Sequence, residues 1–168
     1  MFTDFLLLAP ALVALLALLL FRRIRGLVGD KRKQPSLPDS AIVVDGSNVM
    51  YWGGDASAKT LVQVLRAVEA KGLNPIVFFD ANVGYKLANC YYDEVKLARV
   101  TGVPRKHILV ADKGVVADEW ILDFATKHGL RVVSNDRFRD WGVQFPLVKK
   151  KGRVMRGTYR DGNVVWAK

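Results

Sequence analysis

The chain has 168 residues, which is enough for one domain of ordinary size and too few for two large ones. Hydrophobic residues make up 51% and charged residues 25%, a composition that excludes a disordered or collagen-like chain. Twenty-six Lys and Arg against 16 Asp and Glu give a formal charge of +10, which favours an anionic partner, and the single cysteine excludes an internal disulfide.

The first segment of the chain is apolar. Residues 5–21 carry no charge and would span about 25 Å as a helix, at roughly 1.5 Å per residue. Asp4 is the only charged residue before this run, and several arginines follow it, an order that favours an uncleaved anchor over a cleaved signal peptide. A buried core helix fits less well, because it would normally keep a polar face. We therefore predict a single-pass anchor in a lipid bilayer over residues 1–29, with the N-terminus outside and the following domain in the cytoplasm. A polar linker with two prolines follows over residues 30–40.

Short apolar runs alternate with helical patterns from residue 41 onward. The runs at 41–44, 75–79, 108–111 and 130–133 predict four buried strands, and helical spacing between them predicts three helices. The order βαβαβαβ predicts an α/β fold, with an open, Rossmann-like parallel sheet covered by helices on both faces. Residues 153–159 and 163–166, joined around Asp161 and Gly162, predict a final hairpin.

Carboxylates stand where the predicted strands end. Asp45 ends the first strand, Asp80 ends the second, Asp136 follows the fourth, and Asp118 lies in the first turn of the helix after the third. Because the carboxyl ends of parallel strands meet at one edge of a sheet, we expect these acids to converge there. Asp140 would share a face with Asp136 if the residues between them are helical.

Clustered carboxylates require a bound cation or raised pKa values, because like charges repel. Their oxygens suit Mg²⁺ or Mn²⁺, and a metal held in this way can activate water for hydrolysis of a phosphodiester. Each acid also has a structural interpretation: Asp45 can belong to a turn, Asp118 can complement a helix dipole, and Asp136 can cap a helix. The expectation of a metal site therefore depends on their joint placement.

Three motifs resemble the NYN/PIN-like ribonucleases, particularly the Regnase-type endoribonuclease domain. They are VVDGSNV at 43–49, ADEWI at 117–121 and VVSNDRFRDW at 132–141, and the resemblance covers about residues 41–145. It implies a PIN-like doubly wound sheet with an acidic Mg²⁺ site that cleaves single-stranded or loop RNA. The chain departs from the family pattern at Ala117, where a second acid often precedes Asp118, and at Glu119, which takes the place of an arginine.

The resemblance also implies roles for individual residues. The implied metal ligands are Asp45, Asp118, Asp136 and Asp140, with Asp80 and Glu119 as possible additional acids. Asn48 would fix the site or the scissile phosphate. Whether the site holds one metal or two stays open.

Contacts with RNA are expected from the motifs and from the C-terminal segment, which carries seven positive charges against one negative from residue 146 onward. The residues expected to make them are Ser47, Arg139, Lys149, Lys150, Lys151 and Arg153. Trp52 and Trp141 can either stack on unpaired bases or pack against the core. Gly53 and Gly54 form no phosphate-binding loop, so no nucleotide cofactor is expected.

We therefore predict a membrane-anchored, divalent-metal-dependent endoribonuclease whose nuclease domain covers residues 41–168. The alternative is a tethered RNA-binding module of the same fold without turnover. Cleavage of DNA in place of RNA stays open. A metal-dependent adhesion domain with a DxSxS motif fits less well, because Val49 stands where its second serine would be.

Overall fold

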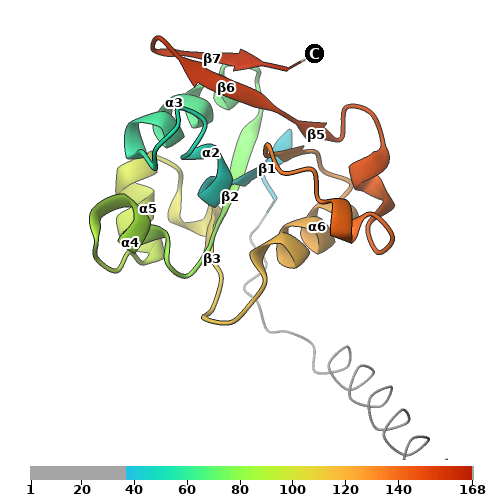
Figure 1. Cartoon of the computed structure of the whole chain (residues 1–168), viewed down its shortest axis with the longest axis horizontal. Helices are drawn as coiled ribbons and strands as arrows, with labels where there is room; N and C mark the ends of the chain where they lie inside the picture. Colours follow the sequence, from blue (N-terminus) through green and yellow to red (C-terminus); the bar gives the residue numbers. More distant parts are fainter. Residues whose placement is uncertain (1–36, 168) are drawn as a thin grey trace, which may run out of the picture. The chain divides into compact units, whose positions relative to one another are not determined.

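The structure, a computed structural model, describes residues 37–167, which fold around a five-stranded parallel sheet (Figure 1). The order of the strands in the sheet is β3-β2-β1-β4-β5. Their bounds are β1 Ala41–Asp45, β2 Asn74–Phe79, β3 Ile108–Val110, β4 Val132–Val133 and β5 Val154–Met155. Two further strands, β6 (Gly157–Arg160) and β7 (Asn163–Trp166), pair as an antiparallel hairpin. The predicted α/β class and parallel sheet are confirmed.

Both faces of the sheet are covered, because alternate residues of the central strands enter two different cores. Ile42 and Val44 belong to one core, and Val43 belongs to the other. The first core includes residues of α3 (Ala58–Glu69), α4 (Val83–Ala88) and α5 (Glu94–Thr101). The second includes residues of α6 (Ala117–Lys127) and of the 3-10 helix η3 (Pro146–Lys149). The predicted arrangement of helices on both faces is confirmed.

The helix α3 shows how the local sequence sets these elements. The hydroxyl of Ser57 accepts a hydrogen bond from the N–H of Thr60 (3.2 Å), which caps the start of the helix. Gly72, at a φ of 73°, turns the chain after its end. The apolar residues at helical spacing are buried, as the pattern predicts: Leu61, Val64, Leu65 and Val68.

The C-terminal part of the fold differs from the prediction. Val154 and Met155 pair in parallel with β4, so the start of the predicted hairpin strand is instead the fifth strand of the sheet. The short helix α4 was not predicted.

Residues 136–140 do not form the helix that would have placed Asp136 and Asp140 on one face. Phe138 is 2% exposed in the second core and has a left-handed φ of 48°, because the backbone turns to bury its ring. Only the 3-10 turn η2 (Arg139–Trp141) follows it. Asp136 therefore lies on an irregular loop, and Asp140 lies in the 3-10 turn after it.

The predicted membrane anchor over residues 1–29 lies outside the described residues, as does most of the predicted linker. Within residues 37–167, no helix is both long enough and apolar enough to cross a bilayer.

Candidate active site

The candidate site lies at the carboxyl ends of β1 and β4, in the middle of the sheet. From β1 the chain passes through the one-turn helix α2 (Gly46–Val49) and α3 to β2, whereas it reaches β4 from α6 on the other face. Crossovers that diverge in this way leave a crevice outside the strand ends, which is where open α/β sheets bind ligands. Asp45 is the last residue of β1, and Ser134 follows β4.

Asp45 is buried in this crevice, with 6% of its surface exposed. Its Oδ1 accepts a hydrogen bond from the backbone N–H of Asn48 (3.0 Å), and its Oδ2 accepts one from the hydroxyl of Ser134 (2.9 Å). Burial outweighs these two hydrogen bonds, and the charges of Asp118 and Asp80 add repulsion, so the pKa of Asp45 is raised to about 7. A nearby cation would therefore strongly favour the ionised carboxylate.

Three further carboxylates lie close enough for their charges to act on Asp45 or on one another. Asp118 is half-buried in the first turn of α6, and its pKa is raised by burial and then by the charges of Asp136 and Asp80. Asp80 follows β2, and its Oδ2 lies 3.3 Å from Nζ of Lys86. Asp136 is exposed and accepts a hydrogen bond from the N–H of Phe138 (2.6 Å). We call Asp45, Asp80, Asp118 and Asp136 the acidic edge.

Asp140 and Glu119, the other two predicted acids, lie elsewhere. Asp140 is exposed and lines an open depression of about 510 Å³ together with Arg139 and Asp136. Glu119 faces Gln144, whose side-chain amide donates a hydrogen bond to its Oε1 (3.3 Å). Asp140 thus borders the acidic edge, whereas Glu119 joins α6 to the segment before η3.

Asn48 connects α2 to the loop after β4. Its Oδ1 accepts a hydrogen bond from the indole N–H of Trp52 (3.1 Å) and another from the backbone N–H of Asn135 (2.8 Å). Trp52 is 6% exposed, so of its two predicted interpretations packing in the core is confirmed. The amide oxygen of Asn48 thus holds the loop that carries Asp136.

Three more polar side chains complete this framework. The hydroxyl of Ser47 accepts a hydrogen bond from the N–H of Asp80 (2.8 Å), and that of Ser134 accepts one from the N–H of Asp136 (3.1 Å). The side chain of Asn135 exchanges two hydrogen bonds with the backbone of Gly157, which ties the hairpin to the site. Positioning roles for Ser134 and Asn135 were not predicted, and their place between the fourth strand and Asp136 is the only signal in the sequence.

The basic segment is spread over different parts of the surface. Residues 149–151 are three exposed lysines, which line a cavity of about 390 Å³ with Arg156 and Trp166. Arg153 donates a hydrogen bond to the carbonyl of Leu130 (3.0 Å), just before β5 and β4 begin. Arg153 therefore lies at the amino end of the parallel sheet, opposite the acidic edge, whereas the lysines remain free to meet an anion.

Comparison with known families identifies the family to which the chain belongs. The sequence model of the Zc3h12a-like ribonuclease NYN domain matches residues 38–164, a range that contains the whole acidic edge. The chain belongs to this family. The family assignment that the three motifs predicted is thereby confirmed, and the match extends beyond the motifs to residue 164.

Solved structures with the same fold are ribonucleases of Arabidopsis thaliana. The crystal structure of nuclear proteinaceous RNase P 2 has 20% sequence identity and a TM-score of 0.54, and the match covers 76% of this chain and 29% of that one. A second structure, of nuclear protein-only RNase P 2, has 18% identity and a TM-score of 0.56, with 95% and 36% covered. The chain thus spans about a third of the length of these proteins, and the likeness shows the fold. No curated protein matches the chain.

A divalent cation fits the acidic edge of the NYN domain electrostatically. Within the part of the chain that the structure describes, no three His, Cys, Asp or Glu side chains are arranged to hold a metal ion. The expected set of four carboxylate ligands is therefore not preassembled. Mg²⁺ commonly takes one or two carboxylates and completes its shell with water and substrate phosphate. Burial is the largest cause of the raised pKa values of Asp45 and Asp118, so these are the two carboxylates whose ionisation a bound cation would favour most.

Proposed function

We propose that this NYN domain is a divalent-metal-dependent endoribonuclease that hydrolyses phosphodiester bonds in single-stranded or loop RNA. The observation that carries the proposal is the acidic edge itself, where burial and then the charges of neighbouring carboxylates raise the pKa values of Asp45 and Asp118. Mg²⁺ or Mn²⁺ bound there would supply positive charge for the phosphate and make bound water a better nucleophile. The products would carry 5′-phosphate and 3′-hydroxyl ends.

The residues of the site divide into ligands and supports. Asp45 and Asp118 would hold the cation, while Asp136 adds negative potential beside them. Ser134 keeps the carboxylate of Asp45 in place through its hydroxyl, and Asn48 holds the loop of Asp136. Both supports act through hydrogen bonds that exist before any ligand arrives, so the carboxylate of Asp45 and the loop of Asp136 are held in place although the full set of metal ligands is not preassembled in the described part of the chain.

The surface around the site suits a flexible polyanion. Arg139 borders the depression next to Asp136, where it can contact a phosphate of the bound strand. The lysines at residues 149–151 line a separate cavity and would add salt-dependent attraction for the phosphate backbone of the RNA. Since these contacts read phosphates and not bases, they favour RNA strands of any sequence.

A cleavage assay tests the proposal. The full chain is incubated with end-labelled single-stranded RNA in Mg²⁺ or Mn²⁺ and in excess chelator, beside the variants Asp45→Asn and Asp123→Asn. Asp123 is the matched control, because it is an exposed acid on the same helix as Asp118 but outside the acidic edge. We expect cleavage that needs the cation, persists in Asp123→Asn and is lost in Asp45→Asn. Cleavage that survives in chelator or in Asp45→Asn would overturn the proposal.

A non-catalytic RNA-binding module is the second candidate. It is favoured by the lack, within residues 37–167, of a preassembled group of three metal ligands. In the same assay this module would bind RNA in a salt-sensitive way and give no product with either cation. Gel-shift measurements on the same samples separate the two outcomes.

We also propose that the domain is tethered to a membrane, with the N-terminus outside and the nuclease in the cytoplasm. The support for this is the uncharged run at residues 5–21 and the basic residues that follow it. Extraction of membranes with alkaline carbonate tests the tether. The full chain should stay in the membrane pellet, and its release into the supernatant would count against an integral anchor.

A further inference from the structure

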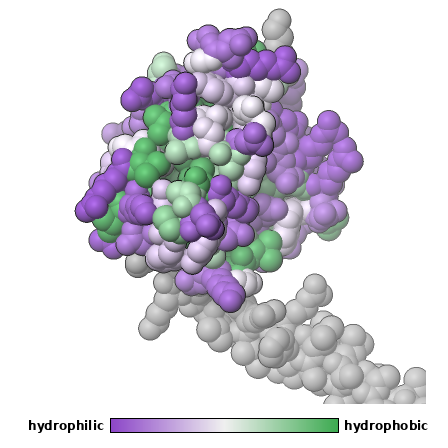
Figure 2. Space-filling view, turned by 60° about the vertical axis from the view of Figure 1, so that its left-hand side comes forward, coloured by the Kyte–Doolittle hydropathy of each residue, from purple (hydrophilic) through white to green (hydrophobic). Residues whose placement is uncertain are grey.

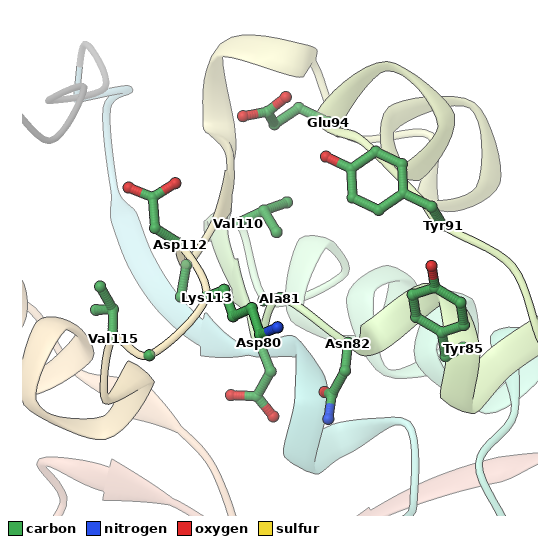
Figure 3. A pocket seen from close by; sticks show the side chains of 12 residues that line it. Asp80, Ala81, Asn82, Tyr85, Tyr91, Glu94, Val110, Asp112, Lys113 and Val115 are labelled. Atoms are coloured by element: carbon green, nitrogen blue, oxygen red, sulfur yellow. The ribbon is translucent and has the colours of Figure 1, made fainter.

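A third cavity opens on the β2–β3 side of the acidic edge, and the proposed function gives it no role. Its volume is about 720 Å³, which is in the range of small-molecule sites, and Asp80 of the acidic edge forms part of its wall (Figure 3). Figure 2 turns the side of the molecule that carries α4 and α5 forward and shows apolar and weakly polar residues gathered there, with hydrophilic residues around them. A ligand in this cavity would lie next to the carboxylates.

Two exposed tyrosines form one wall of the cavity. Tyr85 on α4 is 55% exposed, and Tyr91 in the loop between α4 and α5 is 64% exposed. Figure 3 shows both rings on one side, with Asp112 and Val115 across the cavity from them. Exposed aromatic rings of this kind offer faces on which unpaired bases stack.

Packing against α4 fixes the loop that carries Tyr91. A Cβ at Gly84 would overlap the carbonyl oxygen of Cys90 and would lie 2.5 Å from the backbone nitrogen of Tyr92, so the loop approaches the helix closely. The ammonium of Lys96 lies 4.1 Å from the centre of the Tyr92 ring and holds the far end of the loop. Because this wall is already formed, a ligand would bind with little cost of ordering it.

The rest of the wall combines small apolar residues with three acids. Asp80, Glu94 and Asp112 line the cavity, and among its described lining residues Lys113 is the only base. Lys113 and the ion pair of Asp80 with Lys86 offset part of this negative charge, so the wall has little net attraction for a phosphate. An exocyclic amino group on a base can instead donate a hydrogen bond to a carboxylate, as the amino group of cytosine does to Asp or Glu. Uracil has no such group.

We infer that this cavity binds an unpaired nucleobase with an exocyclic amino group, in preference to uracil, next to the phosphate at the acidic edge. Tyr85 and Tyr91 stack on the base, and Asp112 accepts a hydrogen bond from its amino group. The inference rests on the proposed RNA substrate and specifies the base that the same site selects.

Equilibrium binding of two labelled dodecamers, oligocytidylate and oligouridylate, tests the inference. The two strands have equal charge and similar pyrimidine rings, and differ in the amino group that cytosine carries. Binding to the full chain is followed by fluorescence anisotropy in excess chelator, so that no strand is cleaved. The variants are Tyr85→Ala, Tyr91→Ala, Asp112→Ala and, as matched controls that keep the rings, Tyr85→Phe and Tyr91→Phe.

We expect the wild type to bind oligocytidylate at least about 5-fold more tightly than oligouridylate. Each Tyr→Ala variant should bind oligocytidylate about 5- to 100-fold more weakly, and each Tyr→Phe variant should retain the wild-type affinity. Asp112→Ala should lose the preference for cytosine. Equal binding of the two strands by the wild type, or unchanged affinity in both Tyr→Ala variants, would overturn the inference. Because the binding assay needs no cleavage, its result is independent of whether the chain hydrolyses RNA in the cleavage assay.

Discussion

Replacing Asp45 by asparagine should stabilise the NYN domain above neutral pH while it removes activity. The substitution keeps the shape of the side chain. Its Oδ1 can still accept from the N–H of Asn48, and its amide can donate to the hydroxyl of Ser134, which rotates to accept. The main change is that the side chain can no longer ionise inside the crevice.

The size and sign of the effect follow from the pKa of Asp45, which folding raises from 3.8 to about 7. Below about pH 4 the carboxyl is protonated in both the folded and the unfolded chain and contributes nothing to stability. Between pH 4 and pH 7 the unfolded chain ionises first, so the free energy of unfolding falls by about 1.4 kcal/mol per pH unit. Above pH 7 the loss is constant at about 4 kcal/mol, an upper limit because the folded chain can relax. Asn at this position avoids the whole loss.

Urea denaturation in excess chelator at pH 4.5, 6 and 8 measures this difference. The free energy of unfolding of Asp45→Asn should exceed that of the wild type by only about 1 kcal/mol at pH 4.5 and by up to about 4 kcal/mol at pH 8. Asp123→Asn, on the exposed surface, should follow the wild type at every pH. A difference between Asp45→Asn and the wild type that does not change with pH would refute the assignment of the raised pKa to Asp45.

Three further substitutions test the framework and the surface. Asn48→Ala removes the acceptor of two hydrogen bonds and should cost about 2 to 3 kcal/mol in urea denaturation, whereas Ala at the exposed Asn82 should cost little. Gly46→Ala should lower the free energy of unfolding by about 1 to 3 kcal/mol, because the new Cβ would overlap the ring of Phe79; an unchanged Tm would contradict this packing. Glutamine at residues 149–151 should lower the slope of log Kd against log salt by about 2 for single-stranded RNA, and an unchanged slope would place the lysines away from the RNA.

The sheet was predictable because the sequence of each central strand is itself typical of a buried strand. In β1 and β2 a run of apolar residues is buried on both faces and stops at an aspartate, so both the strand and its end are visible in the sequence. The place of β5 in the sheet was missed because Val154 and Met155, which lie between two arginines, continue directly into the predicted hairpin. A strand this short exists through its pairing with β4, and no local pattern reports that pairing.

The acidic edge was predictable for the same reason. Asp45, Asp80 and Asp136 each follow a strand of one parallel sheet, so topology alone brings their chain positions to one edge. The hydrogen bonds among the supporting side chains were not predictable. Ser134 is 89 residues from Asp45, and Asn135 is 87 residues from Asn48, so their pairing depends on the exact register of β1 against β4.

The surroundings of Asp45 explain how a basic domain keeps an acidic site. The domain has 20 Lys and Arg against 13 Asp and Glu from residue 40 onward, and Lys86 and Arg139 lie beside Asp80 and Asp136, yet no basic side chain is hydrogen-bonded to Asp45 within the described residues. Lysines beside Asp45 would lower its pKa by pairing with it and would compete with a cation. Keeping them away leaves Asp45 destabilised when it is ionised without a partner. Ionising Asp45 in the folded chain costs free energy, and a bound cation would recover part of this cost. This recovery would favour binding of the cation and of the phosphate that the cation brings with it.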